Sequence, residues 1–548
     1  MPPTSPLTAA AARDELVHDR FASRLWKRDP TLFGDALPRD VQGGIRDRLG
    51  WLDAAGRVED DAKELDAFAR AIRTEGLREV YLLGMGGSSL CAEVFRDVST
   101  AEQSNAPVRL TVVDTTDEKR IGDLTTSLRP ERSLFIVASK SGSTIEVTAL
   151  ERHFWALMAQ AAGDGAGSHF VAITDPSTSL AALAKSRGYR QTFINPPDIG
   201  GRYSVLSRFG LVPAALLGVD LGSLGSSAAN MAALCREDSP DNPGLTLGAF
   251  MAAHARSGRD KLTIVTSPAL AAFGPWIEQL VAESTGKGGS GVLPIVGEPR
   301  GDADDYGADR AFVTIASSAD EELASWKTRI EQAGHPVFHI DCGPEQLGAE
   351  FFRWEFATAA AGALLGVNPF DQPDVEAAKQ LTRSQIQAFT STGVLRIDPP
   401  LVSDDVYRLR EHRAASSKAD GRYLAILDYL PADAQRTDDM SEMRRVLRDS
   451  AGLATTHGIG PRYLHSTGQY HKGGPNTGRF LLVTSDDATI TLIPDSGYSF
   501  SVLKHAQALG DFDALVAAGR DVLHVHFPDP AIQTGPILLD LTQRWLAG

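Results

Sequence analysis

The stretch 279–287, QLVAESTGK, contains the residue best placed in this sequence to do chemistry. It is typical of an apolar helix that delivers one carboxylate, Glu283, into a Gly-rich loop. A charge in such a position is unfavourable unless it is paired or has a function, so Glu283 is a candidate general base. Half-buried glutamates are more often ion-paired than catalytic, so this interpretation depends on which other residues accompany Glu283.

A glycine-rich turn, GMGGSS at residues 84–89, follows the apolar run 80–83 and opens a helix that continues through Phe95. Its backbone N–H groups and the helix dipole would face any anion bound at the turn. The turn departs from the GxGxxG spacing of dinucleotide folds, but the next apolar run ends at Asp114, which could bind a ribose. A turn without a ligand and a dinucleotide site both remain alternatives for this motif.

A hydroxyl-rich turn, SKSGST at residues 139–144, follows a third apolar run at 135–138. It places four hydroxyls, a lysine and unpaired backbone N–H groups at a second helix start in the same expected sheet. A single serine there would be a helix cap. Four hydroxyls opposite another anion-binding turn favour a monophosphate site that needs no net positive domain, and thus a small sugar phosphate as ligand.

Two series of short apolar runs supply the strands that must position these turns. Runs that are apolar throughout and alternate with helical stretches indicate parallel strands covered on both faces. The sequence therefore predicts an α/β fold with two tandem doubly wound units. The expected strands are 80–83, 110–113, 134–138 and 170–173 in the first unit, and 262–265, 292–296, 311–315 and 336–340 in the second.

A smaller α/β pattern follows the second unit. Its strand candidates are 423–427, 480–483 and 522–525, and its helix candidates are 440–453 and 498–518. We therefore divide the chain into an N-terminal helical leader at 1–73, a first unit at 74–215, a second at 216–402, and a C-terminal α/β extension at 403–548.

Composition restricts the partners. A chain of 548 residues with 43% hydrophobic and 23% charged residues is typical of a globular protein with several folded units. Its net charge of -16 argues against nucleic acid and anionic membranes as partners. Cys91, Cys235 and Cys342 have no CxxC spacing, which suits a reducing compartment and predicts neither disulfides nor a thiolate zinc site. Without a signal peptide or an apolar run of membrane-spanning length, we expect a cytoplasmic protein.

Five motifs, taken in order, resemble the signatures of the phosphoglucose isomerase (glucose-6-phosphate isomerase) family, which is built from two sugar-isomerase (SIS) domains. They are GMGGS at 84–88, SKSGST at 139–144, GGRYS at 200–204, ESTGK at 283–287 and NPFDQPDVEAAK at 368–379. The tail motifs LHSTGQ at 464–469 and HKGGPN at 471–476 further resemble the isomerase half of transaldolase/phosphoglucose isomerase fusions, here without the transaldolase half.

The resemblance implies a role for each matched residue. Glu283 would move a proton between C2 and C1 of the open-chain sugar, Arg202 would face the enediolate oxygen, and Lys379 would assist ring opening. One carboxylate suffices for an aldose–ketose shift, so we expect no metal and no cofactor. In isolation, Arg202 could instead pair with an acid and Lys379 could be a solvated helix lysine. The implied substrate-binding residues are Gly87, Ser88, Ser139, Lys140, Ser141, Thr144, Gln279 and Gln372.

One departure from the family pattern concerns ring opening. The family has a histidine in the segment after the Glu283 motif, but here the segment 297–310 contains none. Two tail histidines, His465 and His471, fall in a stretch that we expect to be one Gly-rich loop. Either could open the ring beside Lys379, since a neutral imidazole can shuttle a proton near neutral pH. It is equally open that they only join the tail to the core.

The function expected from the resemblance is the interconversion of glucose 6-phosphate and fructose 6-phosphate, in glycolysis and gluconeogenesis. The alternatives are a broader phosphoglucose/phosphomannose isomerase and a non-catalytic sugar-phosphate sensor, and a nicotinamide-dependent dehydrogenase ranks below both. A sensor would have no use for Glu283 together with Arg202 and Lys379. The expected partner is a small sugar phosphate, and the family tends towards homodimers.

Overall fold

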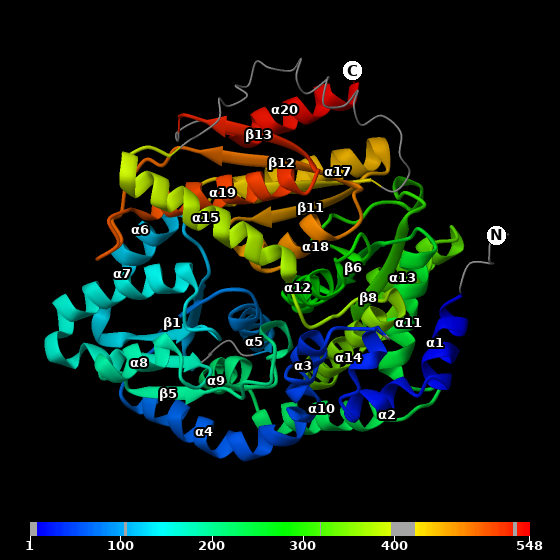
Figure 1. The fold of residues 1–548 in the computed structure, drawn as a ribbon, viewed down its shortest axis with the longest axis horizontal. Coiled ribbons are helices and arrows are strands. Elements are labelled where there is room, and N and C mark those ends of the chain that lie inside the picture. Colours follow the sequence, from blue (N-terminus) through cyan, green and yellow to red (C-terminus); the bar gives the residue numbers. More distant parts are fainter. Residues whose placement is uncertain are drawn as a thin grey trace.

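The fold contains parallel sheets covered by helices (Figure 1). The computed structural model describes residues 8–34, 36–102, 107–317, 319–395, 422–529 and 534–547. Within these ranges the strand orders are β2-β1-β3-β4-β5, β7-β6-β8-β9 and β11-β10-β12-β13, and every pairing inside the sheets is parallel. The predicted α/β class is confirmed.

All the strands expected from apolar runs are present, and the structure adds β5 and β11. Both added strands lie at sheet edges and are only partly buried, so neither has a continuous apolar run. The strands are β1 Glu79–Gly84, β2 Arg109–Val113, β3 Ser133–Ala138, β4 Phe170–Thr174, β5 Gln191–Ile194, β6 Lys261–Thr266, β7 Leu293–Val296, β8 Arg310–Ala316, β9 Val337–Asp341, β10 Tyr423–Tyr429, β11 Ala454–Ile459, β12 Gly478–Ser485 and β13 Asp521–Phe527.

Helices cover the faces of the sheets. None in the described part of the chain is both long and apolar enough to cross a membrane. They are α1 Ala9–His18, α2 Phe21–Trp26, α3 Arg39–Arg46, α4 Val58–Thr74, α5 Leu90–Glu102, α6 Glu118–Ser127, α7 Ile145–Ala162, α8 Ser179–Ser186, α9 Arg208–Leu217, α10 Leu221–Cys235, α11 Pro243–Arg256, α12 Phe273–Thr285, α13 Glu321–Gln332, α14 Leu347–Leu365, α15 Pro373–Thr392, α17 Ala434–Ala451, α18 Gly468–Gly473, α19 Phe500–Ala517 and α20 Thr534–Ala547.

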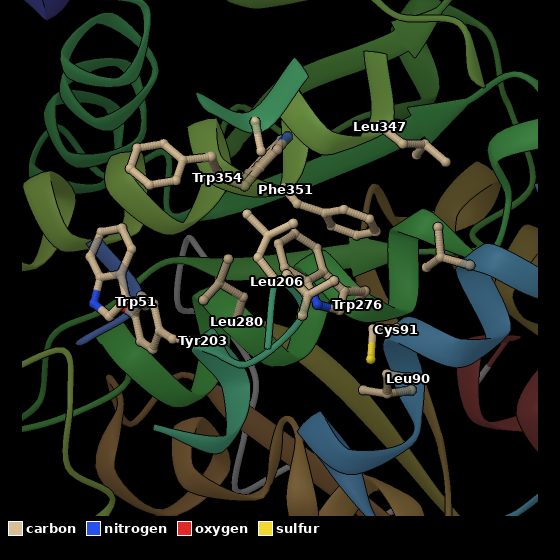
Figure 2. Packing of buried hydrophobic residues seen from close by; sticks show 14 of the residues in the cluster. Trp51, Leu90, Cys91, Tyr203, Leu206, Trp276, Leu280, Leu347, Phe351 and Trp354 are labelled. Carbon is tan, nitrogen blue, oxygen red and sulfur yellow. The ribbon is translucent and has the colours of Figure 1, made fainter. Parts of the chain in front are cut away.

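The largest apolar core joins the N-terminal helices to both of the first two sheets. Trp51 stacks on Tyr203 at 5.2 Å between ring centroids, and Trp276 of α12 packs edge-on against Phe351 of α14 at 4.8 Å (Figure 2). The segments that carry the candidate site thus rest on buried aromatic rings. The proposed domain limits stay predictions, and the limit at 402/403 lies outside the described residues.

The two anion-binding turns expected from the sequence leave neighbouring strands. β1 and β3 pair in register from Glu79 with Ser133 to Gly84 with Ala138, so the turns 84–89 and 139–144 begin side by side. The order β2-β1-β3 places them where the chain leaves the sheet in opposite directions, the point at which open parallel sheets bind ligands.

The C-terminal sheet lies above the first two sheets in the view of Figure 1. Helix α15 packs along α19, and α18 packs on α12. Ala282 of α12 shares an apolar cluster with Tyr470 and Phe480 of the C-terminal unit. The C-terminal unit therefore contacts the helix that carries Glu283.

Gly87 lies where two turns approach each other most closely. A Cβ built at Gly87 would lie 2.0 Å from the backbone oxygen of Gly201. The turn 84–89 and the loop before Arg202 can therefore touch only through glycine backbone.

We predict that Gly87→Ala destabilises the protein by about 1–3 kcal/mol, the usual range for an overpacked site, because one of the two turns must shift. The control is Gly122→Ala in α6, where a Cβ would meet nothing within 4 Å. Thermal unfolding of both variants and of the wild type tests the prediction. Equal melting temperatures for Gly87→Ala and Gly122→Ala would contradict it.

Candidate active site

Glu283 lies in the last turn of α12, whose residues are nearly all buried. Gly286 caps the end of the helix, and a Cβ there would lie 2.5 Å from the Cα of Tyr470. The Glu283 side chain is 12% exposed, and its Oε1 lies 3.3 Å from Nη1 of Arg202. Its Oε2 accepts a hydrogen bond from Nε2 of Gln279 at 3.2 Å. Gln279 is one turn earlier on the same face of the helix, as expected.

Arg202 is held by partners on every nitrogen of its guanidinium. Nε donates to Oγ of Ser284 at 2.7 Å, and Nη1 donates to Oε1 of Gln372 at 3.1 Å. Nη2 donates to two backbone oxygens of the segment 369–371, at 2.7 and 2.9 Å. A guanidinium bound on all sides is a fixed positive charge. The structure thus brings Arg202, Glu283 and Gln372 into one polar cluster.

Lys287 joins this cluster and was not among the expected site residues. Its Nζ lies 2.9 Å from Oδ1 of Asp371 and donates to the backbone oxygen of Asn368. Burial, and next the charge of Arg202, lower the pKa of Lys287 to about 7. A lysine with this pKa can exchange a proton near neutral pH. Its position at the end of the ESTGK motif was the signal in the sequence.

The hydroxyl turn forms a compact network before α7. Oγ of Ser139 lies 2.9 Å from Oγ1 of Thr144, and Oγ of Ser143 donates to Oγ of Ser141 at 3.2 Å. The Lys140 side chain does not join this network. Its Nζ forms an ion pair with Asp175 and donates to the backbone oxygen at position 197 at 3.2 Å. In this structure the Lys140 side chain is therefore paired outside the hydroxyl turn.

A cavity of about 310 Å³ lies beside the hydroxyl turn. Lys379 lines it from α15 although its Nζ also lies 3.4 Å from Glu376, the surface pairing expected of an ordinary helix lysine. The structure thus brings three expected features, the hydroxyl turn, Lys379 and His465, around one cavity. Its lining includes Ser141, Ser143, Thr144, Lys379, His465 and Gln507.

Gln279 connects this cavity to the Arg202–Glu283 cluster. Its Nε2 donates to Oε2 of Glu283 and also to the backbone oxygen of His465, at 3.2 and 2.7 Å. The glycine-rich turn contacts Gln279, since a Cβ at Gly86 would lie 2.6 Å from its Nε2, and Gly87 and Ser88 of this turn are buried. Glu283 itself is not among the residues that line the 310 Å³ cavity.

The two tail histidines occupy different environments. Nε2 of His465 lies 2.9 Å from Oε1 of Glu146 at the start of α7. His471 is buried in the C-terminal unit, where its Nδ1 lies 3.0 Å from the hydroxyl of Tyr423, and burial lowers its pKa well below the ordinary value. The expectation of one shared Gly-rich loop is wrong, because the segment folds into the 3-10 helix Arg462–His465 and α18. His471 does not line the cavity.

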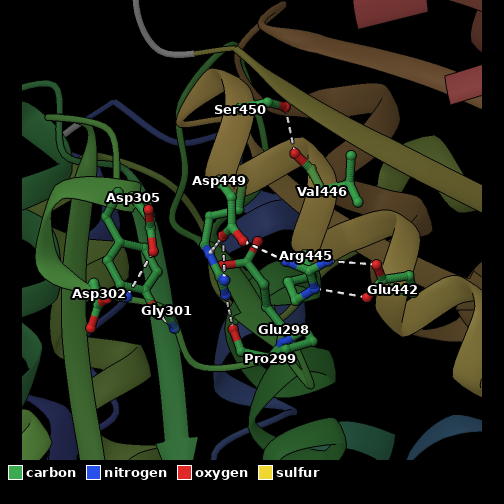
Figure 3. A network of polar contacts seen from close by, with 12 residues as sticks. Glu298, Pro299, Gly301, Asp302, Asp305, Glu442, Arg445, Val446, Asp449 and Ser450 are labelled. Carbon is green, nitrogen blue, oxygen red and sulfur yellow. Dashed lines mark hydrogen bonds and ion pairs between the residues drawn. The ribbon is translucent and has the colours of Figure 1, made fainter. Parts of the chain in front are cut away.

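The segment 297–310, which lacks a histidine, is fixed against the C-terminal unit. Oε2 of the buried Glu298 lies 3.0 Å from Nη2 of Arg310, and Oε1 accepts a hydrogen bond from Oγ1 of Thr455 at 3.0 Å. Arg448 of α17 donates to the backbone oxygen of Pro299. Figure 3 shows Glu298 and Pro299 beside α17. The segment does not line the cavity.

No group of three or more His, Cys, Asp or Glu side chains in the described part of the chain is placed to hold a metal ion. The cysteines Cys91, Cys235 and Cys342 are buried and unbridged.

Comparison with known proteins agrees with the motifs. The family model of phosphoglucose isomerase matches residues 58–292. The chain is 31% identical over 366 residues to the glucose-6-phosphate isomerase of Rubrobacter xylanophilus, covering 58% of this chain and 84% of that protein. It is 30% identical over 383 residues to the glucose-6-phosphate isomerase of Symbiobacterium thermophilum, covering 60% and 85%.

Solved structures share the fold. A hypothetical protein from Thermus thermophilus matches with a TM-score of 0.59 and 25% identity, over 69% of this chain and 96% of that one. A glucose-6-phosphate isomerase from Chlamydia trachomatis matches with a TM-score of 0.51 and 20% identity, over 68% and 78%, which supports the fold alone. Given its identity to the curated relatives over most of their length, the chain belongs to the phosphoglucose isomerase family.

Proposed function

We propose that this protein interconverts glucose 6-phosphate and fructose 6-phosphate through an enediolate, the aldose–ketose isomerisation of glycolysis and gluconeogenesis. The curated relatives are named glucose-6-phosphate isomerases. The observation that carries the proposal is the placement of the Glu283–Arg202 pair next to the hydroxyl-lined cavity, bridged to it by Gln279.

The phosphate is assigned to the hydroxyl turn, where Ser139, Ser141 and Thr144 and the start of α7 supply donors. The sugar then extends from this turn towards Glu283. The carboxylate removes the C2 proton of the open-chain aldose and returns it to C1 of the enediolate, which gives the ketose. Arg202 stabilises the negative charge on the enediolate oxygen, and because its guanidinium is already fixed, little reorganisation is needed.

Gln279 and Gln372 are assigned to substrate positioning because they hold Glu283 and Arg202, respectively. Gly87 and Ser88 supply backbone of the neighbouring turn, and Lys379 supplies a positive charge at the cavity wall. The broader phosphomannose activity and the non-catalytic sensor are not favoured, since the named relatives are glucose-6-phosphate isomerases.

We predict that Glu283→Gln lowers kcat by about 10²–10⁴-fold while sugar-phosphate binding stays nearly unchanged, because the amide keeps the shape and removes only the proton acceptor. A coupled assay on fructose 6-phosphate measures kcat, and calorimetric titration with 6-phosphogluconate measures binding. Glu321→Gln, at an exposed position in α13, is the control. A Glu283→Gln enzyme with more than about a tenth of wild-type kcat would show that Glu283 is not the base.

Replacing Ser139 and Thr144 together by alanine should raise KM more than it lowers kcat, because phosphate contacts persist from substrate to transition state. The matched control replaces Thr126 and Ser127 of α6, whose hydroxyls donate to carbonyls of their own helix. Steady-state kinetics with fructose 6-phosphate separate KM from kcat. An unchanged KM in the site variant would exclude the hydroxyl turn from phosphate binding.

Chelation should leave activity intact, because Glu283 transfers the proton and Arg202 balances the enediolate charge. The measurement is kcat/KM before and after dialysis against EDTA. A loss of activity that added divalent metal restores would contradict the metal-free mechanism.

A further inference from the structure

We propose that His465, supplied by the C-terminal unit, is the proton shuttle that opens the sugar ring, with Glu146 and Gln507 as positioning residues. This inference rests on the proposed isomerase function and adds the step before enediolate formation. Of the two tail histidines expected to open the ring, only His465 is included, because His471 is buried away from the cavity.

The first support is a hydrogen-bonded chain that converges on one carboxylate oxygen. Oε1 of Glu146 lies 2.9 Å from Nε2 of His465 and accepts from Nε2 of Gln507 at 2.7 Å. Glu146 lies in the first turn of α7, where the helix dipole favours a negative charge. Burial raises the pKa of Glu146, but the charge of His465 and the hydrogen bonds more than offset this and leave it below its ordinary value.

This pairing selects one form of the imidazole. An ionised carboxylate only accepts hydrogen bonds, so Nε2 of His465 must carry the hydrogen. When the ring has given up its other proton, its lone pair is on Nδ1, and none of the hydrogen bonds of the described residues involves that atom. The side chain is 19% exposed and lines the cavity. Nδ1 is therefore the nitrogen left to act as a base on a side chain that lines the cavity.

The second support is the place of His465 between the two halves of the site. Its ring belongs to the cavity formed by the hydroxyl turn and Lys379. Its backbone oxygen is bound by Gln279, which also bonds Glu283. Through Gln279, the residue that lines the cavity is therefore joined to the carboxylate of the proposed base.

The third support is the rigidity with which the C-terminal unit presents His465. Arg462, at the start of the same 3-10 helix, forms ion pairs with Glu93 and with Asp114, the latter at 3.0 Å. Tyr463 donates to Asp511 of α19 at 2.7 Å. These contacts, of which the Tyr463–Asp511 hydrogen bond is buried, hold the turn on both sides, so the histidine is kept in place before substrate binds.

The reaction balances with one proton. Nδ1 of His465 takes the hydrogen of the C1 hydroxyl as the C1–O5 bond breaks. The electron pair of that bond goes to O5, a carbonyl forms between C1 and O1, and the imidazolium returns its proton to O5. The net change is the transfer of a proton from O1 to O5, so no cofactor is consumed. The ammonium of Lys379, at the wall of the same cavity, stabilises negative charge on O5.

The test separates ring opening from enediolate formation. Ring opening is followed by NMR exchange between the α and β anomers of glucose 6-phosphate, which requires the open form. Enediolate formation is followed by deuterium uptake from D₂O into C1 of 5-deoxyfructose 6-phosphate. This ketose lacks the C5 hydroxyl and has an esterified O6, so it stays acyclic while keeping the spacing from C1 to phosphate.

We expect His465→Ala to slow anomer exchange by about 10²-fold or more and to leave deuterium uptake within about threefold of wild type. Glu146→Gln should shift the ratio of the two rates in the same direction. If His465 and Glu146 had only structural roles, their variants would depress both rates together. His18→Ala, exposed at the end of α1, is the control and should change neither rate.

Glu283→Gln should show the reverse pattern, with anomer exchange kept and deuterium uptake lost, so failure of the base assignment is distinguishable from failure of the His465 assignment. Circular dichroism checks folding, and His465→Asn replaces His465→Ala if the latter does not fold. If neither His465 variant lowers anomer exchange relative to deuterium uptake by at least about tenfold, the proposal is overturned.

Discussion

The ion pair between Arg202 and Glu283 is the interaction on which the site depends. Both side chains are nearly buried, so each charge needs its partner, and the guanidinium needs further acceptors. Those acceptors come from Ser284 and from the segment 369–372. Three segments far apart in the sequence must therefore meet before the arginine is satisfied, and Glu283, the proposed base, is held where they meet.

The apolar core behind this pair makes the position rigid. Tyr203, next to Arg202, stacks on Trp51 of the N-terminal region, and Trp276 anchors α12 against Phe351. Residues 1–73, which were interpreted as an N-terminal helical leader, include Trp51, and Trp51 packs in the same core as residues of both sheets. A site that stabilises charge without reorganising needs such packing behind it. If the arginine were mobile, part of the binding free energy of the ligand would be lost in ordering it.

The sequence predicted the strands and the neighbouring turns of the candidate site, because there local pattern determines structure. Apolar runs located the strands, and parallel order placed the turns 84–89 and 139–144 side by side. The edge strands β5 and β11 were not predicted, because partly exposed edge strands lack a continuous apolar run. The pairing of Glu146 with His465, 319 positions apart, has no local signal. His471 was placed in a loop because GQYHKG is rich in glycine, whereas packing against Tyr423 and Phe480 buries it.

The C-terminal unit is bound to two segments that carry residues of the candidate site. Gln469 of α18 donates to the backbone oxygen of Gly286 at 3.0 Å and to Oδ2 of Asp374 at 2.5 Å, and it accepts from the backbone N–H of Asp374 at 3.0 Å. It therefore ties the end of the Glu283 helix to the start of α15, which follows Gln372 and carries Lys379. A single side chain that bridges both elements couples docking of the C-terminal unit to the geometry of the site. Loss of the Gln469 contacts would remove one restraint from the end of α12 and one from the start of α15.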